Sequence, residues 1–200
     1  MVDRLLTPSK ITAWLDCAHS LTLRHQVDGG LLDPPPSVFG EMAEMLLKKG
    51  LDHEQAVLAR YRADGREVFE VPDREQGERF ADWVARVGDV LGQGHDVVFQ
   101  MPFVHNGIRG IADFLERVVD HSGAVTYEPV DAKLARNAAK PGHVLQLCFY
   151  AEAIAAQLGH MPKHLHIELG SSERESIPTA NVLAYWRRLR RQLASLLAQT

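Results

Sequence analysis

The sequence predicts an α/β fold in which helices flank a central mixed sheet that contains an antiparallel meander. Two observations support this class. Apolar residues recur at the 3.6-residue period of helices up to about residue 95, and the period then changes to the two residues typical of strands. A helix, a short strand and a final helix follow. Because each amphipathic element must bury one face, we expect one sheet with helices packed on it.

The N-terminal part, residues 1–95, is expected to be helical. Ser9 or Thr7 would cap the first helix, since a short polar side chain accepts hydrogen bonds from the free amide groups at a helix start. Gly50 is the weak point of the second helix, because glycine in a helix interior lowers stability. Apolar spacing predicts three helices, which cover residues 9–26, 37–62 and 73–92.

Residues 96–200 carry the predicted sheet. Residues 105–107 (His-Asn-Gly) and 120–123 (Asp-His-Ser-Gly) have the composition of hairpin turns, so the extended runs around them should pair as antiparallel neighbours. Pro141 and Pro178 are placed to open two further helices. The expected strands cover residues 97–104, 108–119, 125–134 and 164–169, and the expected helices cover residues 141–158 and 178–200. The 200 residues are interpreted as a single domain, either whole or excised from a longer protein.

The composition excludes several classes of protein. Apolar residues make up 46% of the chain, but no run approaches the roughly 20 that a membrane helix needs, so no membrane partner is expected. Cys17 and Cys148 are too few for a disulfide framework or a four-thiolate metal site. The start of the chain lacks the apolar core of a signal peptide, which predicts a cytoplasmic protein.

Three common catalytic and nucleotide-binding motifs are also missing from the sequence. These are the nucleophile elbow Gly-x-Ser-x-Gly, the phosphate loop that ends in Gly-Lys-Ser or Gly-Lys-Thr, and the dinucleotide motif Gly-x-Gly-x-x-Gly. Their absence excludes the hydrolases, nucleotidases and dehydrogenases that depend on them.

The formal charge of −4 counts against a nucleic-acid binder, but the charge is unevenly distributed. Residues 181–200 contain four arginines and no acidic residue, so this segment carries +4 and the other 180 residues carry −8. The arginines either follow a phosphate backbone or form a solvated basic flank that interacts favourably with the helix end. They are Arg187, Arg188, Arg190 and Arg191.

Two carboxylates interrupt the predicted meander. Asp113 lies between Ile111 and Leu115 on one face of its strand, so it should be at least half buried and in need of a partner. On the next strand, the two-residue period places Asp131 and Lys133 on one face. If these strands pair, Asp113 and Asp131 converge.

Two carboxylates and a lysine in this arrangement suit metal-dependent phosphodiester cleavage. Mg²⁺ prefers carboxylate and water oxygens, and the Lys133 ammonium can orient or deprotonate a water and offset phosphate charge. The strand period puts Glu128 on the opposite face and excludes it. An ion pair that merely closes the sheet is the structural alternative, since Asp-x-Lys triplets are common.

The helix predicted after this strand adds two polar side chains. Gln146 and Tyr150 are i and i+4 neighbours that lie off its apolar stripe, so an amide and a phenol point the same way. They face the carboxylates or form a solvated flank. His160, His164 and His166 are a further polar group, but two histidines on a strand and a third beyond a proline do not define a zinc site.

Four short motifs occur in order along the chain: Gly50-x-x-His53, Gly110-Ile111-Ala112-Asp113, Asp131-Ala132-Lys133 and Gln146-x-x-x-Tyr150. Together they resemble the RecB-like branch of the PD-(D/E)XK nucleases. Residues 7–11 and Cys17 also resemble the opening helix of that group, and residues 127–136 resemble its bacterial members particularly closely. The resemblance covers most of the chain and implies a restriction-endonuclease-like core.

The resemblance implies a centre that holds Mg²⁺ or Mn²⁺, with ligands on a helix and on two neighbouring strands. These ligands would be His53, Asp113, Asp131 and the backbone carbonyl of Ala132. Lys133 would be the catalytic lysine that acts with the two aspartates. Gln146 and Tyr150 would position the nucleic-acid strand and organise the site.

The chain departs from the iron–sulfur relatives of this group, which include CRISPR-associated exonucleases. Those proteins hold a cluster on four cysteines, one near the N-terminus and three near the C-terminus. Cys17 stands where the first would be, but no cysteine follows Cys148, which lies on the apolar stripe of its helix. No iron–sulfur cluster is expected in these 200 residues.

The sequence therefore predicts a metal-dependent DNA nuclease that acts on single strands or DNA ends in repair, recombination or defence. A helicase or another component of a nuclease complex is an expected partner. Two alternatives stay open. The fold could be a catalytically inactive module that binds DNA or a partner, or the same metal site could hydrolyse small phosphoesters, although the sequence gives no signal for a nucleotide pocket.

Overall fold

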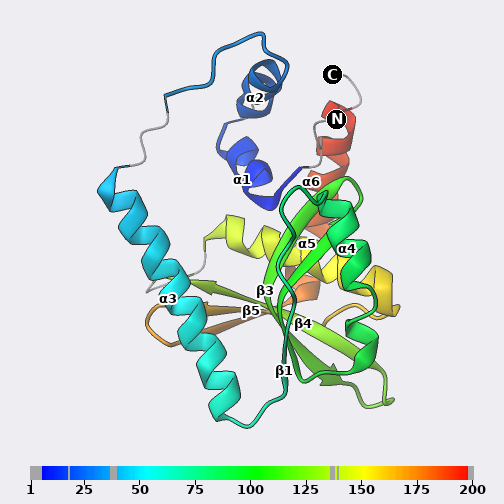
Figure 1. Cartoon of the computed structure of the whole chain (residues 1–200). Helices are drawn as coiled ribbons and strands as arrows, with labels where there is room; N and C mark the ends of the chain where they lie inside the picture. Colours follow the sequence, from blue (N-terminus) through cyan, green and yellow to red (C-terminus); the bar gives the residue numbers. More distant parts are fainter. Residues whose placement is uncertain (1–5, 18, 37–39, 136–137, 139, 198–200) are drawn as a thin grey trace.

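The computed structural model describes residues 6–17, 19–36, 40–135, 138 and 140–197. These residues form a six-stranded mixed sheet with helices on both faces, which confirms the predicted α/β class (Figure 1). Within the described ranges, no helix combines the length and the apolar character that crossing a lipid bilayer requires.

The sheet runs in chain order from β1 to β6, so each strand pairs with its neighbours in sequence. Strands β2, β3 and β4 form the predicted antiparallel meander, and β5 and β6 are also antiparallel. The β1–β2 and β4–β5 pairs are parallel, which requires crossover connections. The strands are β1 (Val68–Glu70), β2 (Val97–His105), β3 (Ile108–Val119), β4 (Val125–Lys133), β5 (His164–Leu169) and β6 (Arg174–Pro178).

Helices approach the sheet from both sides (Figure 1). On one face, α3 packs Val57, Leu58 and Tyr61 against apolar side chains of β2, β3 and β4. On the other face, α5 is buried among side chains from the sheet and from α1, α4 and α6. The helices are α1 (Pro8–Asp16), α2 (Ser20–Asp28), α3 (Glu41–Ala63), α4 (Phe80–Val87), α5 (Pro141–Leu158) and α6 (Thr179–Leu197), with a 3-10 turn at Leu91–Gln93. Helices α3 and α5 can therefore both present side chains to the meander.

The prediction of one helix over residues 9–26 is wrong, because two helices occupy this range. Thr7 caps α1 as predicted, and its side chain accepts a hydrogen bond from the Lys10 amide. Cys17 then adopts an extended backbone conformation, and its N–H closes the helix on the carbonyl of Ala13. The apolar period alone does not reveal this break.

The other two predicted N-terminal helices differ in how well they match. Helix α3 begins at Glu41 and runs through Gly50 without a break, while Ser37, its predicted first residue, lies outside the described part of the chain. The helix predicted over residues 73–92 is wrong in extent. It is reduced to α4 and the 3-10 turn, because Gly77 and Gly88 adopt positive φ angles of 81° and 62° that a helix does not allow.

Strands β2 to β5 match the four predicted strands to within one residue, whereas β1 and β6 were not expected. Strand β1 has only three residues, too few for a visible alternation. Pro178 ends β6 and does not start the final helix, which begins at Thr179. Strand β6 is the edge of the sheet, where a missing amide hydrogen is tolerated.

Candidate metal and catalytic centre

Asp113 and Asp131 come together between β3 and β4. The last residue pair of this ladder is Phe114–Val130, so the two aspartates are the next residues on each strand. The Oδ2 atom of Asp113 accepts a hydrogen bond of 2.9 Å from the backbone N–H of Ala132. The strand register therefore places the two carboxylates side by side.

Asp131 is almost completely buried. Asp131 is 1% exposed to solvent, and Asp113 is 8% exposed. Burial, followed by repulsion from the Asp113 carboxylate, holds the pKa of Asp131 well above its usual range. The Oδ2 atom of Asp131 has no hydrogen-bond partner among the residues that the structure describes. A buried carboxylate oxygen without a donor raises the free energy of the site, so this position favours a cation or a proton.

Lys133 contacts both aspartates. Its Nζ atom lies 2.8 Å from Oδ1 of Asp131 and 3.5 Å from Oδ2 of Asp113. Burial lowers the pKa of Lys133, but attraction to Asp131 and Asp113 outweighs burial and raises the pKa to about 12. The side chain is therefore an ammonium at neutral pH. In this arrangement it supplies positive charge and hydrogen bonds to the two carboxylates. Its role in activating a water stays a prediction.

Glu54 on α3 is a member of the site that the sequence analysis missed. Burial, and then repulsion from Asp113, raise the pKa of Glu54 to about 7, and Lys133 partly offsets this shift. One carboxylate oxygen accepts a hydrogen bond of 3.0 Å from Nε2 of Gln100 on β2. Gln100 has a φ of 59°, an uncommon backbone conformation for a residue other than glycine. The site therefore contains three carboxylates and one ammonium.

A sequence signal for Glu54 was present. It lies three, four and seven residues before Val57, Leu58 and Tyr61, which are the buried residues of α3. This spacing puts Glu54 on the helix stripe that faces the sheet. A carboxylate on an otherwise buried stripe needs a partner, and that need could have drawn attention to it.

His53 lies next to Glu54 but has a different neighbour. Its Nε2 atom lies 3.1 Å from the backbone oxygen of Glu168 on β5. Ala132 is buried between Asp131 and Lys133, and its N–H is already bonded to Asp113. Across the described ranges, no group of three or more histidine, cysteine, aspartate or glutamate side chains is arranged to hold a metal ion. The ligand roles of His53 and of the Ala132 carbonyl stay predictions.

Gln146 and Tyr150 reach the site from α5. The Nε2 atom of Gln146 donates to Oδ1 of Asp131 at 3.5 Å and to Oη of Tyr150 at 3.3 Å. The Tyr150 hydroxyl donates to the backbone oxygen of Ile111 on β3 at 2.5 Å. Both side chains thus face the carboxylates and do not form a solvated flank.

Gly110 permits the close approach of Tyr150 to β3. A Cβ atom at this position would lie 2.9 Å from Oη of Tyr150 and 3.1 Å from a ring carbon of Phe149. We expect Gly110→Ala to push the phenol off the Ile111 carbonyl and to lower the free energy of unfolding by about 1–3 kcal/mol, measured by denaturant titration. Gly50→Ala is the control, because nothing lies within 4 Å of the position that a Cβ atom would take there. Unchanged stability of Gly110→Ala would contradict this account of the packing.

Polar groups elsewhere are engaged with one another. Glu128 faces away from the aspartates, as predicted, and its carboxylate contacts Nδ1 of His164 at 3.1 Å and Nε2 of His166 at 2.8 Å. His166 also contacts Oγ of Ser176 at 2.8 Å. These histidines therefore belong to a cluster around Glu128 and not to the aspartate site.

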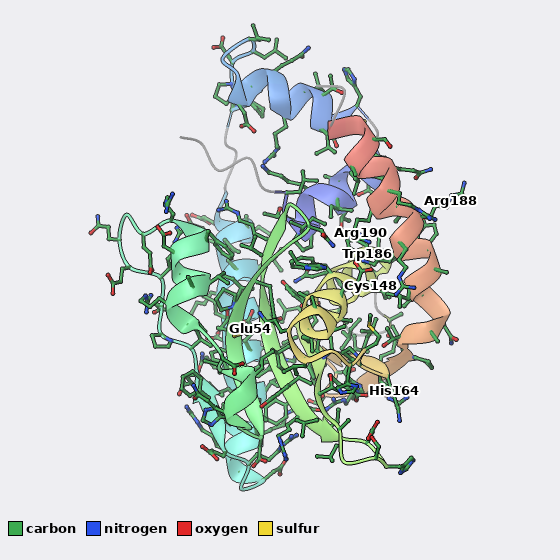
Figure 2. The ribbon with its side chains drawn as sticks, turned by 90° about the vertical axis from the view of Figure 1, so that its right-hand side faces the viewer. Glu54, Cys148, His164, Trp186, Arg188 and Arg190 are labelled. Carbon is green, nitrogen blue, oxygen red and sulfur yellow. The ribbon has the colours of Figure 1, made fainter. Side chains whose placement is uncertain are left out.

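The arginines of α6 are partly engaged as well (Figure 2). Buried Glu152 on α5 accepts a hydrogen bond of 2.8 Å from the indole N–H of Trp186. Arg187 and Arg190 lie 3.6 Å and 3.4 Å from the same carboxylate. Neither alternative for the basic segment included this contact, through which Arg187 and Arg190 attach α6 to α5.

Comparison with known proteins does not identify a family for this chain. No family model matches the chain, and no curated protein matches it.

Proposed function

We propose that the chain is a metal-dependent nuclease that hydrolyses phosphodiester bonds in DNA, on a RecB-like, restriction-endonuclease-like core. One observation carries the proposal: Asp131 is buried against Asp113, and its Oδ2 atom lacks a hydrogen-bond partner within the described part of the chain. The order of the four motifs that resemble RecB-like nucleases supports it.

The donor chemistry fits a hard divalent cation. Glu54, Asp113 and Asp131 together carry −3 when ionised, and Lys133 returns +1, so a divalent ion would neutralise the remainder. Carboxylate oxygens are the ligands that Mg²⁺ and Mn²⁺ prefer. Asp113 and Asp131 would hold the ion with water molecules, and the Glu54 carboxylate would add negative charge nearby. The ion would polarise the scissile phosphate and lower the pKa of a bound water.

The remaining residues would position the substrate and balance charge. The Lys133 ammonium would stabilise the negative charge that develops on the phosphate, because water screens a fixed charge less in a partly buried site. Gln146 would orient Asp131, to which it already donates a hydrogen bond. Tyr150 would hold Gln146 in place from α5.

Calorimetric titration with Mn²⁺, followed by cleavage assays on single-stranded and duplex DNA, tests the proposal. We expect Mn²⁺ to bind and DNA to be cut only with Mn²⁺ or Mg²⁺ present. Binding of DNA by a protein that neither binds Mn²⁺ nor cuts would contradict the proposal and favour an inactive DNA-binding module. Hydrolysis of small phosphoesters without cleavage of DNA would reject DNA as the substrate.

A further inference from the structure

A cleft of about 760 Å³ opens beside the aspartate site. The start of α1 and the segment 73–83, which includes most of the first turn of α4, form its walls, and β3 and α5 form its floor. Gln146 and Tyr150 line this floor, and Gln146 also donates to Asp131. A molecule in the cleft would therefore lie one side chain away from the candidate metal ligands.

The walls of the cleft combine positive charge, hydroxyl groups and apolar surface. Arg74 and Arg109 supply two guanidinium groups and Asp73 supplies a carboxylate, and the Glu78 carboxylate lies near enough to Arg74 to be attracted to it. The Arg109 guanidinium lies over the ring of Phe80, 5.2 Å from its centroid, which fixes its position. Arg74 is exposed at the wall. These groups suit a sugar–phosphate backbone, because arginine binds phosphate oxygens and hydroxyl groups donate hydrogen bonds to them.

The cleft is a better candidate for contacting the substrate than the basic face of α6. Arg187 and Arg190 on α6 lie against the buried Glu152 carboxylate, so part of their charge is already compensated. Arg188 points away from the sheet into solvent (Figure 2). Arg74 is likewise attracted to the Glu78 carboxylate, but the cleft arginines line the same space as Gln146, which touches the site.

The shape of the cleft selects an unpaired strand. Its volume lies within the range of about 300–1,000 Å³ that holds a small molecule, which corresponds to a short piece of one strand. A cleft of about 760 Å³ has no room for two paired strands side by side, so a duplex could not lie inside it. A single strand bends freely and can enter.

We infer that the cleft between α1 and the segment 73–83 holds the part of a single DNA strand next to the scissile phosphate, with Arg74 and Arg109 as its positioning residues. This inference rests on the proposed function. It assigns the strand to the cleft and leaves the four arginines of α6 outside the binding path.

Fluorescence anisotropy with a short labelled oligodeoxythymidine, in EDTA so that nothing is cut, tests the inference. Arg74→Gln should weaken binding by about threefold to tenfold and reduce the slope of log K against log salt by about 0.7, the value for one lost contact to a single strand. Arg188→Gln on α6 is the matched control and should change neither quantity. Thermal melts should show both variants folded, because both arginines are exposed.

A photo-crosslinking 4-thiothymidine oligonucleotide adds a second readout, and crosslinks should map to β3 or to residues 73–83. Equal binding by wild type and Arg74→Gln, crosslinks to α6, or equal competition by duplex DNA would each overturn the inference. Cleavage in Mn²⁺ is measured separately. If the wild type binds the oligonucleotide through Arg74 but does not cleave DNA, the nuclease is rejected and the cleft inference is kept. If the wild type cleaves DNA but its binding does not depend on Arg74, the cleft inference is rejected and the nuclease is kept.

Discussion

Asp131→Asn is expected to lower metal-dependent DNA cleavage by at least about 10³-fold, which corresponds to about 4 kcal/mol of lost transition-state stabilisation. Asparagine keeps the shape of the side chain but removes the charge and one of the oxygens that would hold the cation. The measurement is the single-turnover cleavage rate in Mn²⁺ at saturating enzyme. The same variant should show weaker Mn²⁺ binding by calorimetry.

The stability of this variant separates loss of function from loss of fold. Because burial and Asp113 hold the pKa of Asp131 high, the ionised carboxylate destabilises the metal-free folded chain at neutral pH. Asp131→Asn should therefore melt in EDTA at or above the wild-type temperature. Asp64→Asn, at an exposed position after α3, is the control and should retain cleavage. Wild-type cleavage by Asp131→Asn would remove this residue from the site.

Glu54→Gln should have opposite effects on stability and on activity. The pKa of Glu54 is raised to about 7, well above the usual range of a glutamate, so the folded chain holds this proton more tightly than the unfolded chain. The stability of the metal-free wild type should therefore fall as pH rises from about 4.5 to about 7, and the loss persists above that range. Glutamine cannot ionise, so Glu54→Gln should melt a few degrees above wild type at about pH 8 and close to it at about pH 4.5.

Bound metal should reduce this advantage in stability of Glu54→Gln over the wild type. Mn²⁺ stabilises the folded state that binds it, and the gain should be smaller in Glu54→Gln, which lacks one carboxylate. Cleavage in Mn²⁺ should fall at the same time. Glu44→Gln, on an exposed part of the same helix, should match the wild type in every measurement. A pH dependence of stability identical to wild type in Glu54→Gln would show that Glu54 does not titrate in the site.

The meander illustrates what local patterning predicts well. Strands β2, β3 and β4 are long extended runs rich in apolar residues and are joined by turns of typical composition, so their limits and antiparallel order followed from the sequence. The β1 and β6 strands lack that signal, and the glycines at 77 and 88 break a stretch whose apolar period still looks helical. The second error arises because the apolar period reports which side chains are buried, not whether the backbone conformation is continuous.

The sequence by itself placed Asp131 and Lys133 on one face of a strand, because alternation along a strand fixes the face on which each side chain lies. It made their convergence with Asp113 conditional on the pairing of two strands, which the structure shows. It also placed Gln146 and Tyr150 on one side of α5 through their i, i+4 spacing. Only the tertiary structure decided that Glu54 joins them. That contact depends on how α3 crosses the sheet, and the crossing is set by the packing of Val57, Leu58 and Tyr61 on distant strands.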